Sequence, residues 1–291
     1  MKVLLKIIPL LFIITLAVLL ACKPRRASAP QNPTGYQLDA PEKFNMPDNL
    51  LEISGIAFNN YDPARIYSIQ DEEGRLFSQV WEVKKATSTR FGQRGDYEDL
   101  AIMNQQVFVL KSNGHIYGFK LDIEKDDVSE QTRVWEDLLP KAEYESLYAD
   151  EKEQTFYVLT KTAGKKNKKT LGYKLKYKNG DFAFDETEKF ELDVKAIQAL
   201  GLKKLKSGLK VSALSRHPET KEWYILSSAD KLLVIANSDW SIKTAYDLDS
   251  SVFSQPEGIA FDSALNMYIS NEGDEISNGN ILKFKYNSGS K

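Results

Sequence analysis

The sequence predicts an all-β fold, and within that class a β-propeller with five blades. Three observations predict it: short apolar strands rich in Tyr, Phe and Val between turn residues, a small motif that recurs five times, and a second strand that follows every copy. Short strands between regularly spaced turns are typical of all-β proteins. A repeat of about 40–50 residues is typical of four-stranded propeller blades.

The recurring motif is a polar residue, a small or polar residue and then an aliphatic residue that leads into a strand. Its copies begin at residues 54, 98, 145, 212 and 257, so they are separated by 44, 47, 67 and 45 residues. Five copies in the same phase favour a propeller over a β-sandwich. The copies are Ser54-Gly55-Ile56-Ala57, Glu98-Asp99-Leu100-Ala101, Glu145-Ser146-Leu147-Tyr148, Ser212-Ala213-Leu214-Ser215 and Glu257-Gly258-Ile259-Ala260.

Each copy is followed by a second apolar strand, at 66–69, 107–110, 156–159, 223–226 and 267–270. The interval of 67 residues also contains a lysine-rich loop at 165–169 and apolar residues at helical spacing over 194–206. We interpret both as insertions in one blade, including a helix near 194–206, and keep a degenerate sixth blade as the alternative. Residues 36–44 are expected to close the ring as an outer strand beside 281–286, which would cover edges prone to aggregation.

The first 21 residues predict a secretory signal peptide. Lys2 and Lys6 precede an apolar run over 7–20, which is shorter than the roughly 20 residues of a membrane-spanning helix. Leu19-Leu20-Ala21-Cys22 resembles the lipobox of bacterial lipoproteins, and Cys22 is the only cysteine. A lone cysteine at this place favours lipidation over an uncleaved anchor with a chance cysteine. We predict acyl chains such as palmitate on Cys22, anchoring the chain to an inner or outer membrane.

The rest of the chain divides into two parts. Residues 22–46 contain Pro24, Pro30, Pro33 and Pro41 and predict a flexible tether after the lipidated cysteine. Residues 47–287 predict a single propeller domain. Without residues 1–21 the chain has 37 basic and 41 acidic residues, a net charge of −4. This mildly acidic, interspersed charge excludes a nucleic-acid binder, which would present a basic face.

The repeat also predicts where chemistry lies. Equivalent residues of the first strands converge on a propeller's axis, and here these are Ser54, Glu98, Glu145, Ser212 and Glu257. The second strand runs antiparallel to the first, so its end returns to the same face. We therefore expect a ligand-binding mouth that includes Asp71, Glu72, Asn271 and Glu272.

Three converging glutamates repel one another unless protons or a metal compensate. Carboxylates and amide oxygens suit Ca²⁺, which tolerates irregular geometry, so Glu98, Glu145 and Glu257 are candidate metal ligands. The equal alternative is that these glutamates bond to backbone amides and neighbouring cations and hold the blades together. Because Ser54 and Ser212 replace carboxylates, any metal site is lopsided.

Other chemistries have less support. His115 and His217 are the only histidines, which excludes a multi-histidine zinc site. The sequence has no Gly-x-Ser-x-Gly elbow and no phosphate loop. Residues 274–279 resemble a calcium loop, but Ile276 occupies a ligand position. Trp81, Trp135 and Trp240 are interpreted as packing residues of outer strands rather than ligand-stacking residues.

Four of the motifs, in their wider context, resemble the SdiA-regulated protein family. They are Glu52-Ile53-Ser54-Gly55-Ile56-Ala57, Asp96-Tyr97-Glu98-Asp99-Leu100-Ala101, Val211-Ser212-Ala213-Leu214-Ser215-Arg216-His217-Pro218 and Gln255-Pro256-Glu257-Gly258-Ile259-Ala260-Phe261-Asp262. Met267-Tyr268-Ile269-Ser270-Asn271-Glu272-Gly273 is similar to the family's last blade, and the resemblance covers about 50–286. It implies a β-propeller, membrane association in bacteria and a bound calcium ion, but no reaction.

Two functions follow as hypotheses. The first is a lipid-anchored module of the cell envelope that binds a small molecule or an envelope protein, with Ca²⁺ ordering the mouth. The sequence favours this non-enzymatic role because it shows no arrangement of nucleophile, base and orienting residue. The alternative is a calcium-dependent hydrolase of an ester, lactone or phosphoester, in which an axial metal polarises the substrate and Asp71 or Glu272 assists. This alternative rests on analogy between folds.

Overall fold

The computed structural model describes residues 32–82, 85–161, 169–202, 205 and 208–289. The predicted signal peptide, Cys22 and most of the lysine-rich loop lie outside these residues. Within them, no helix is both long enough and apolar enough to cross a membrane.

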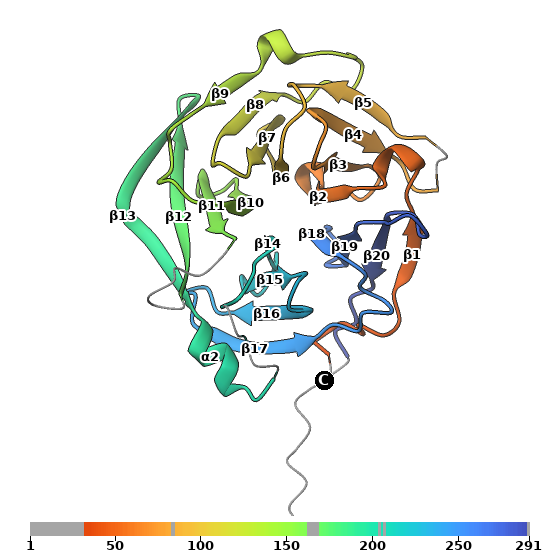
Figure 1. Ribbon diagram of the computed structural model, residues 1–291, viewed down its shortest axis with the longest axis vertical. Helices are drawn as coiled ribbons and strands as arrows, with labels where there is room; N and C mark the ends of the chain where they lie inside the picture. The colour runs from red at the N-terminus through yellow and green to blue at the C-terminus, as the bar shows by residue number, and fades with distance from the viewer. Residues whose placement is uncertain (1–31, 83–84, 162–168, 203–204, 206–207, 290–291) are drawn as a thin grey trace, which may run out of the picture. The chain divides into compact units, whose positions relative to one another are not determined.

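Five four-stranded antiparallel sheets are arranged around a central axis (Figure 1). The all-β, five-bladed prediction is confirmed, and the alternative of six blades is wrong. The first blade consists of β2 (Ile53–Ala57), β3 (Ile66–Gln70), β4 (Arg75–Gln79) and β5 (Thr87–Arg90), and the second of β6 (Tyr97–Met103), β7 (Gln106–Lys111), β8 (Ile116–Lys120) and β9 (Arg133–Trp135). The third blade consists of β10 (Tyr144–Asp150), β11 (Thr155–Thr160), β12 (Lys169–Lys178) and β13 (Asp181–Asp193). The fourth consists of β14 (Ala213–Arg216), β15 (Trp223–Ser227), β16 (Leu232–Ala236) and β17 (Ile242–Asp247).

The fifth blade joins the two ends of the described chain. Its strands are β18 (Pro256–Phe261), β19 (Met267–Asn271), β20 (Asn280–Phe284) and, from the other end, β1 (Glu42–Asn45). β1 pairs antiparallel with β20, and Phe44 lies opposite Ile281. The predicted closure of the ring is therefore confirmed, although the strand starts at residue 42 rather than 36. The preceding Tyr36 is buried, and its hydroxyl donates to the Leu265 carbonyl at 2.7 Å.

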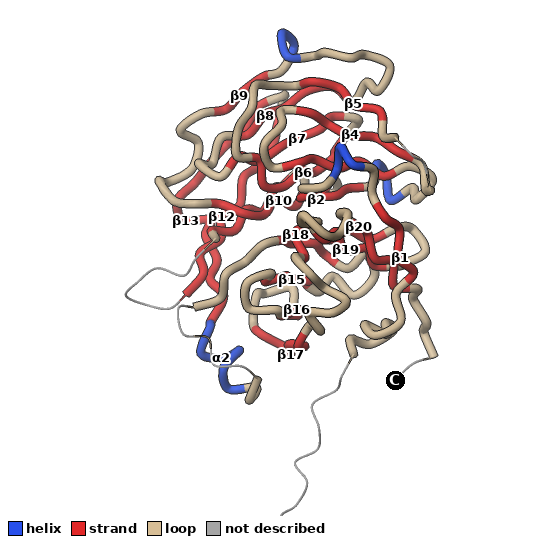
Figure 2. Tube along the Cα trace, turned by 45° about the vertical axis from the view of Figure 1, so that its right-hand side comes forward, coloured by secondary structure: helices blue, strands red, loops and turns tan. Residues whose placement is uncertain are grey.

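The insertion in the long interval is mostly strand. β12 and β13 are 10 and 13 residues long, and they extend the third blade well beyond the others. The helix α2 is shorter than predicted and covers Val194–Ala199, where the Asp193 side chain accepts from the Lys195 N–H at 2.8 Å as an N-cap. It lies outside the ring of strands (Figure 2). Short 3₁₀ turns occupy Asp48–Leu50, Asn59–Tyr61 and Ser129–Gln131.

The core consists of five hydrophobic clusters, one at each junction between neighbouring blades. In one of them, Ile69 of the first blade packs with Leu100 and Val109 of the second. The three tryptophans pack against other aromatic residues, as predicted, but only Trp135 lies on an outer strand, while Trp81 and Trp240 lie in the loops before β5 and β17. Trp240 stacks on Trp223 with centroids 4.1 Å apart, while Trp81 contacts Phe44 and Trp135 contacts Phe182, with centroids 4.7 and 4.9 Å apart. Burial between blades is therefore what joins the sheets.

The closing strand should contribute measurably to stability. Phe44→Ala removes the contact with Trp81 across the last junction and should lower the free energy of unfolding by about 2 kcal/mol, below the cost of truncating a fully buried Phe. Urea denaturation measures this change. Lys43→Ala, on the exposed face of the same strand, is the matched control and should change stability little; equal effects of the two substitutions would contradict this role of Phe44.

Candidate functional site

The three candidate glutamates share one structural feature. The strand register shifts between Tyr97 and Asp99 in β6, between the residues flanking Glu145 in β10, and between Pro256 and Gly258 in β18. Glu98, Glu145 and Glu257 are thus the extra residues of β-bulges at the start of the first strands. A bulge redirects a side chain away from the regular alternation of the strand. The repeat places all three at the same level of the axis.

The two serines at the equivalent positions bind neighbouring strands instead. The Ser54 hydroxyl donates to the Glu98 carbonyl at 2.6 Å, and the Ser212 hydroxyl donates to the Pro256 carbonyl at 2.8 Å. The approach of neighbouring strands is close enough to require glycine, because a Cβ on Gly258 would lie 2.7 Å from the Ser54 carbonyl oxygen. Ser54 and Ser212 therefore join blades, and the glutamates at this level come from the second, third and fifth blades.

Glu98 and Glu145 form a coupled pair beside one cation. The Glu145 side chain is buried and forms an ion pair with Lys161, which follows β11. Burial and the neighbouring Glu145 carboxyl raise the pKa of Glu98 to about 9. Burial also raises the pKa of Glu145, while Lys161 and a hydrogen bond with Glu98 oppose this shift. At neutral pH the pair therefore holds a proton, with Glu98 as donor and Glu145 as acceptor.

The remaining glutamates extend the acidic region towards the fifth and first blades. Burial and then Glu272 raise the pKa of Glu257 to about 8. Burial and then Asp71 raise the pKa of Glu272 to about 7. Burial and the neighbouring Glu52 carboxyl raise the pKa of Asp71 as well. Because each group influences the others, the structure brings the predicted first-strand and second-strand residues into one acidic mouth.

Glu72 and Asn271 differ from the rest of the predicted mouth. Glu72 is half exposed and pairs with Arg94, whose side chain is largely exposed. Asn271 is fully buried, and its amide donates to the Asn280 side-chain oxygen at 3.1 Å. In the described part of the chain, the Asn271 Oδ1, Gln70 Oε1 and Asp71 Oδ1 atoms are buried without a hydrogen-bond donor. These three atoms are all acceptors, so a donor or a cation would satisfy them.

The donor chemistry of the mouth fits a hard cation, since every predicted ligand presents oxygen. As the side chains stand, no three His, Cys, Asp or Glu residues among those described form a group that could hold a metal ion. The Asp274 carboxyl, in the rejected calcium-like loop, accepts from the Ile276 and Ser277 N–H groups at 2.8 and 2.7 Å. That carboxyl caps its own loop.

Lys161, Glu52 and Asp96 were missed by the sequence reasoning. A signal for Lys161 existed in the repeat: the residue after each second strand is Asp71, Ser112, Lys161, Ser228 or Glu272. Aligning these positions would have shown one cation among polar and acidic residues. Glu52 and Asp96 precede the first strands of their blades, and both add to the shift of mouth carboxyls.

Comparison with known families identifies the chain. The SdiA-regulated family matches residues 32–275, which is most of its length. The chain belongs to the SdiA-regulated family. No curated protein matches it significantly.

Solved structures share the fold of this SdiA-regulated protein at low identity. A glutaminyl cyclase of Myxococcus xanthus is 10% identical with a TM-score of 0.55, covering 84% of this chain and 95% of its own. A luciferin-regenerating enzyme is 9% identical with a TM-score of 0.53, covering 87% of this chain and 97% of its own. At these identities the likeness shows the propeller fold alone.

The raised pKa values make stability depend on pH. Glu98 has a higher pKa in the folded chain than its ordinary value near 4.5, so the folded state binds more protons and stability should fall as pH rises from about 5 to 9. Glu98→Gln should flatten this decline and make the variant about 1–2 kcal/mol more stable than the parent at pH 9. Urea denaturation with a chelator at pH 6 and 9 measures it. The exposed Glu188→Gln is the control, and a Glu98→Gln curve parallel to the parent's would disprove the linkage.

Proposed function

We propose that this SdiA-regulated propeller is a membrane-tethered binding module whose acidic mouth binds Ca²⁺ and, with it, a small molecule or envelope protein. One observation carries the proposal: Glu98 and Glu257 have pKa values of about 9 and 8 because burial and neighbouring carboxyls disfavour their charged forms. A bound cation would remove that penalty by compensating the charge directly.

The charge balance around the mouth supports a cation rather than an anion. Among the described residues of the mouth, Lys161 is the cation that pairs with a buried carboxyl, and its partner is Glu145. Glu98, Glu145 and Glu257 would hold the ion, and it would supply the positive charge that lets all three ionise together. The buried acceptors of Gln70 and Asn271 extend the same chemistry towards the first and fifth blades.

A binding role agrees with the places of the two histidines. His115 contacts Glu136 at 3.6 Å on an outer edge of the second blade. His217 is buried, and its Nε2 lies 3.0 Å from the Tyr36 hydroxyl. Neither imidazole is among the groups that shift the pKa values of the mouth carboxyls, which respond to one another and to Lys161. Ligand recognition there would rest on oxygen ligands, hydrogen bonds and charge.

Calcium binding can be measured by calorimetry on the full chain in detergent micelles at pH 7. The parent should bind Ca²⁺, and Glu98→Gln and Glu257→Gln should each weaken binding at least about tenfold, or roughly 1.4 kcal/mol. Because both carboxyls hold protons at this pH, binding should also release protons, so the heat should vary with the ionisation enthalpy of the buffer.

The control for these variants is Glu188→Gln, an exposed carboxyl paired with Lys174 on the outer strands. It should bind Ca²⁺ like the parent. A parent that binds no Ca²⁺ would contradict the cation proposal. Hydrolysis of ester, lactone or phosphoester substrates by the parent, abolished in Glu98→Gln, would contradict the non-enzymatic role.

The tether is tested separately at Cys22. Cys22→Ser removes the thiol that would carry the acyl chains, so incorporation of labelled palmitate should be lost and the unprocessed chain should accumulate. Ser28→Ala, in the predicted tether, is the control and should label like the parent. Equal labelling of the parent and Cys22→Ser would show that the lipid is not on Cys22.

A further inference from the structure

The other end of the axis holds a cavity of different chemistry from the acidic mouth. It provides about 630 Å³ of space, including the part open to solvent, and the first strands of all five blades line it. Each blade contributes the aliphatic residue of its motif: Ile56, Leu100, Leu147, Leu214 and Ile259. The surface of the cavity is about as polar as it is apolar, and small-molecule sites are concave spaces in which placed polar groups orient the ligand.

The charges of this cavity already have partners. Asp99 is buried, and its carboxylate accepts from the Leu100 and Leu147 N–H groups, both at 2.8 Å. Glu151, the other charged residue described around the cavity, accepts from the Asn104 N–H at 3.3 Å. Burial raises the pKa of Asp99 well above its usual range. With both carboxyls engaged, the cavity walls favour a neutral ligand over a charged one.

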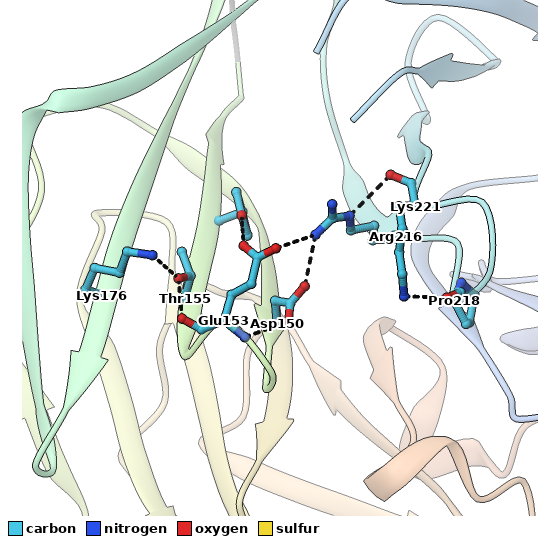
Figure 3. Close-up of polar contacts among 8 residues, drawn as sticks. Asp150, Glu153, Thr155, Lys176, Arg216, Pro218 and Lys221 are labelled. Atoms are coloured by element: carbon cyan, nitrogen blue, oxygen red, sulfur yellow. Dashed lines mark hydrogen bonds and ion pairs between the residues drawn. The ribbon is translucent and has the colours of Figure 1, made fainter. Parts of the chain in front are cut away.

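Arg216 and Asp150 lie on the strands beside this cavity and neutralise each other. Arg216 Nη1 lies 2.9 Å from Asp150 Oδ2 and 3.4 Å from Glu153 Oε1, so the guanidinium joins the fourth blade to the third (Figure 3). The Arg216 and Asp150 side chains are 12% and 15% exposed. This ion pair is a structural clamp beside the cavity, and it leaves the cavity itself to apolar and hydroxyl contacts.

Tyr61 lines the cavity in an unusual backbone conformation. It has φ 59° and follows Asn60 at φ 53°, in the turn between β2 and β3. The left-handed conformation costs a bulky residue roughly 1–2 kcal/mol. The Ser263 N–H donates to the Tyr61 carbonyl at 2.8 Å and helps to hold the turn, yet the Tyr61 residue remains 42% exposed. The same conformation occurs in the corresponding turn of each other blade, at Gln105, Gln154, Lys221 and Leu265, so it is a property of this turn, which holds Tyr61 at the rim of the cavity.

Tyr148 supplies a second ring to the lining of this cavity. Burial and the neighbouring Tyr61 hydroxyl raise the pKa of Tyr148, so its phenol stays neutral, and the two hydroxyls share a hydrogen bond. A neutral phenol can donate to or accept from a ligand group. With Phe58 and Phe261, the cavity thus combines aliphatic side chains, four aromatic rings and hydroxyl groups.

We propose that this cavity binds a small neutral molecule with a planar, apolar body and one hydroxyl or N–H group. The body would pack between the aliphatic residues and the Tyr61 ring, and the polar group would bond to the Tyr148 hydroxyl. This site is separate from the acidic mouth, and it does not depend on calcium or on the proposed function.

Indole is the probe for this proposal, since it is planar, neutral and carries one N–H. Calorimetry on the full chain in detergent micelles, with empty micelles as the blank, should show saturable binding. Tyr61→Gly removes the ring while permitting the left-handed backbone, and it should weaken binding about tenfold. Lys221→Gly is the matched control: Lys221 has φ 60° in the corresponding turn of the fourth blade and does not line the cavity.

Two further measurements keep the test decisive. Ala149→Leu, at a partly exposed lining position, should reduce binding by filling the space even if the Tyr61 variant is unstable. Indole binding should be the same with Ca²⁺ and with a chelator, which separates it from the mouth. No saturable binding to the parent would overturn the proposal, as would equal weakening by Tyr61→Gly and Lys221→Gly.

Discussion

The hydrogen bonds that join one blade to the next at the acidic mouth are the constraint on which the rest of the structure depends. In the first three blades, the carbonyl just after the second strand accepts from the backbone N–H at the start of the next blade. Tyr97 donates to Asp71 at 2.8 Å, and Val211 donates to Lys161 at 3.0 Å. Buried backbone groups need such partners. Asp71 and Lys161 thus join the blades through their backbones while their side chains line the mouth.

Because the blades are joined in this way, neighbouring first strands lie close together around the axis. The short distance limits the size of the residues that fit between them. A Cβ on Gly55 would lie 2.4 Å from the Asp99 carboxylate, which in turn binds the Leu147 N–H of the third blade. Neighbouring blades therefore contact through small residues and one buried acid. Glu98, Glu145 and Glu257 each lie one position before the second residue of the motif, at a β-bulge. The bulge turns their side chains away from the contacts between blades and towards the mouth.

The two ends of the axis have opposite chemistry for a geometric reason. Each first strand begins at the mouth, where the motif starts with a polar residue, and runs towards the other end through an aliphatic residue. Five copies repeat this pattern and give one end rich in carboxyls and one end lined by aliphatic and aromatic residues with hydroxyl groups. Burial and then repulsion among carboxyls raise the pKa values of Glu98 and Glu257. Burial raises the pKa of Asp99 as well, although its side-chain oxygens accept from the Leu100 and Leu147 N–H groups.

The sequence by itself determined the repeat, the blade order and the level at which Glu98, Glu145 and Glu257 lie, because equivalent residues of a repeat take equivalent places in successive blades. It also indicated the closing strand, although the start of β1 depends on pairing with β20. The repeat singles out Lys161 as the one cation after a second strand, but its pairing with Glu145 depends on how the side chains pack at the mouth.

Only the tertiary structure decided how side chains at equivalent positions behave. Ser54 and Ser212 occupy the places of the glutamates, yet they bind neighbouring carbonyls, because hydrogen bonding depends on distances between blades. The cavity near Tyr61 likewise exists only when five strands converge. Local sequence specifies strands and turns through periodicity, whereas ionisation and cavities arise from groups that are distant in the chain and brought together by packing.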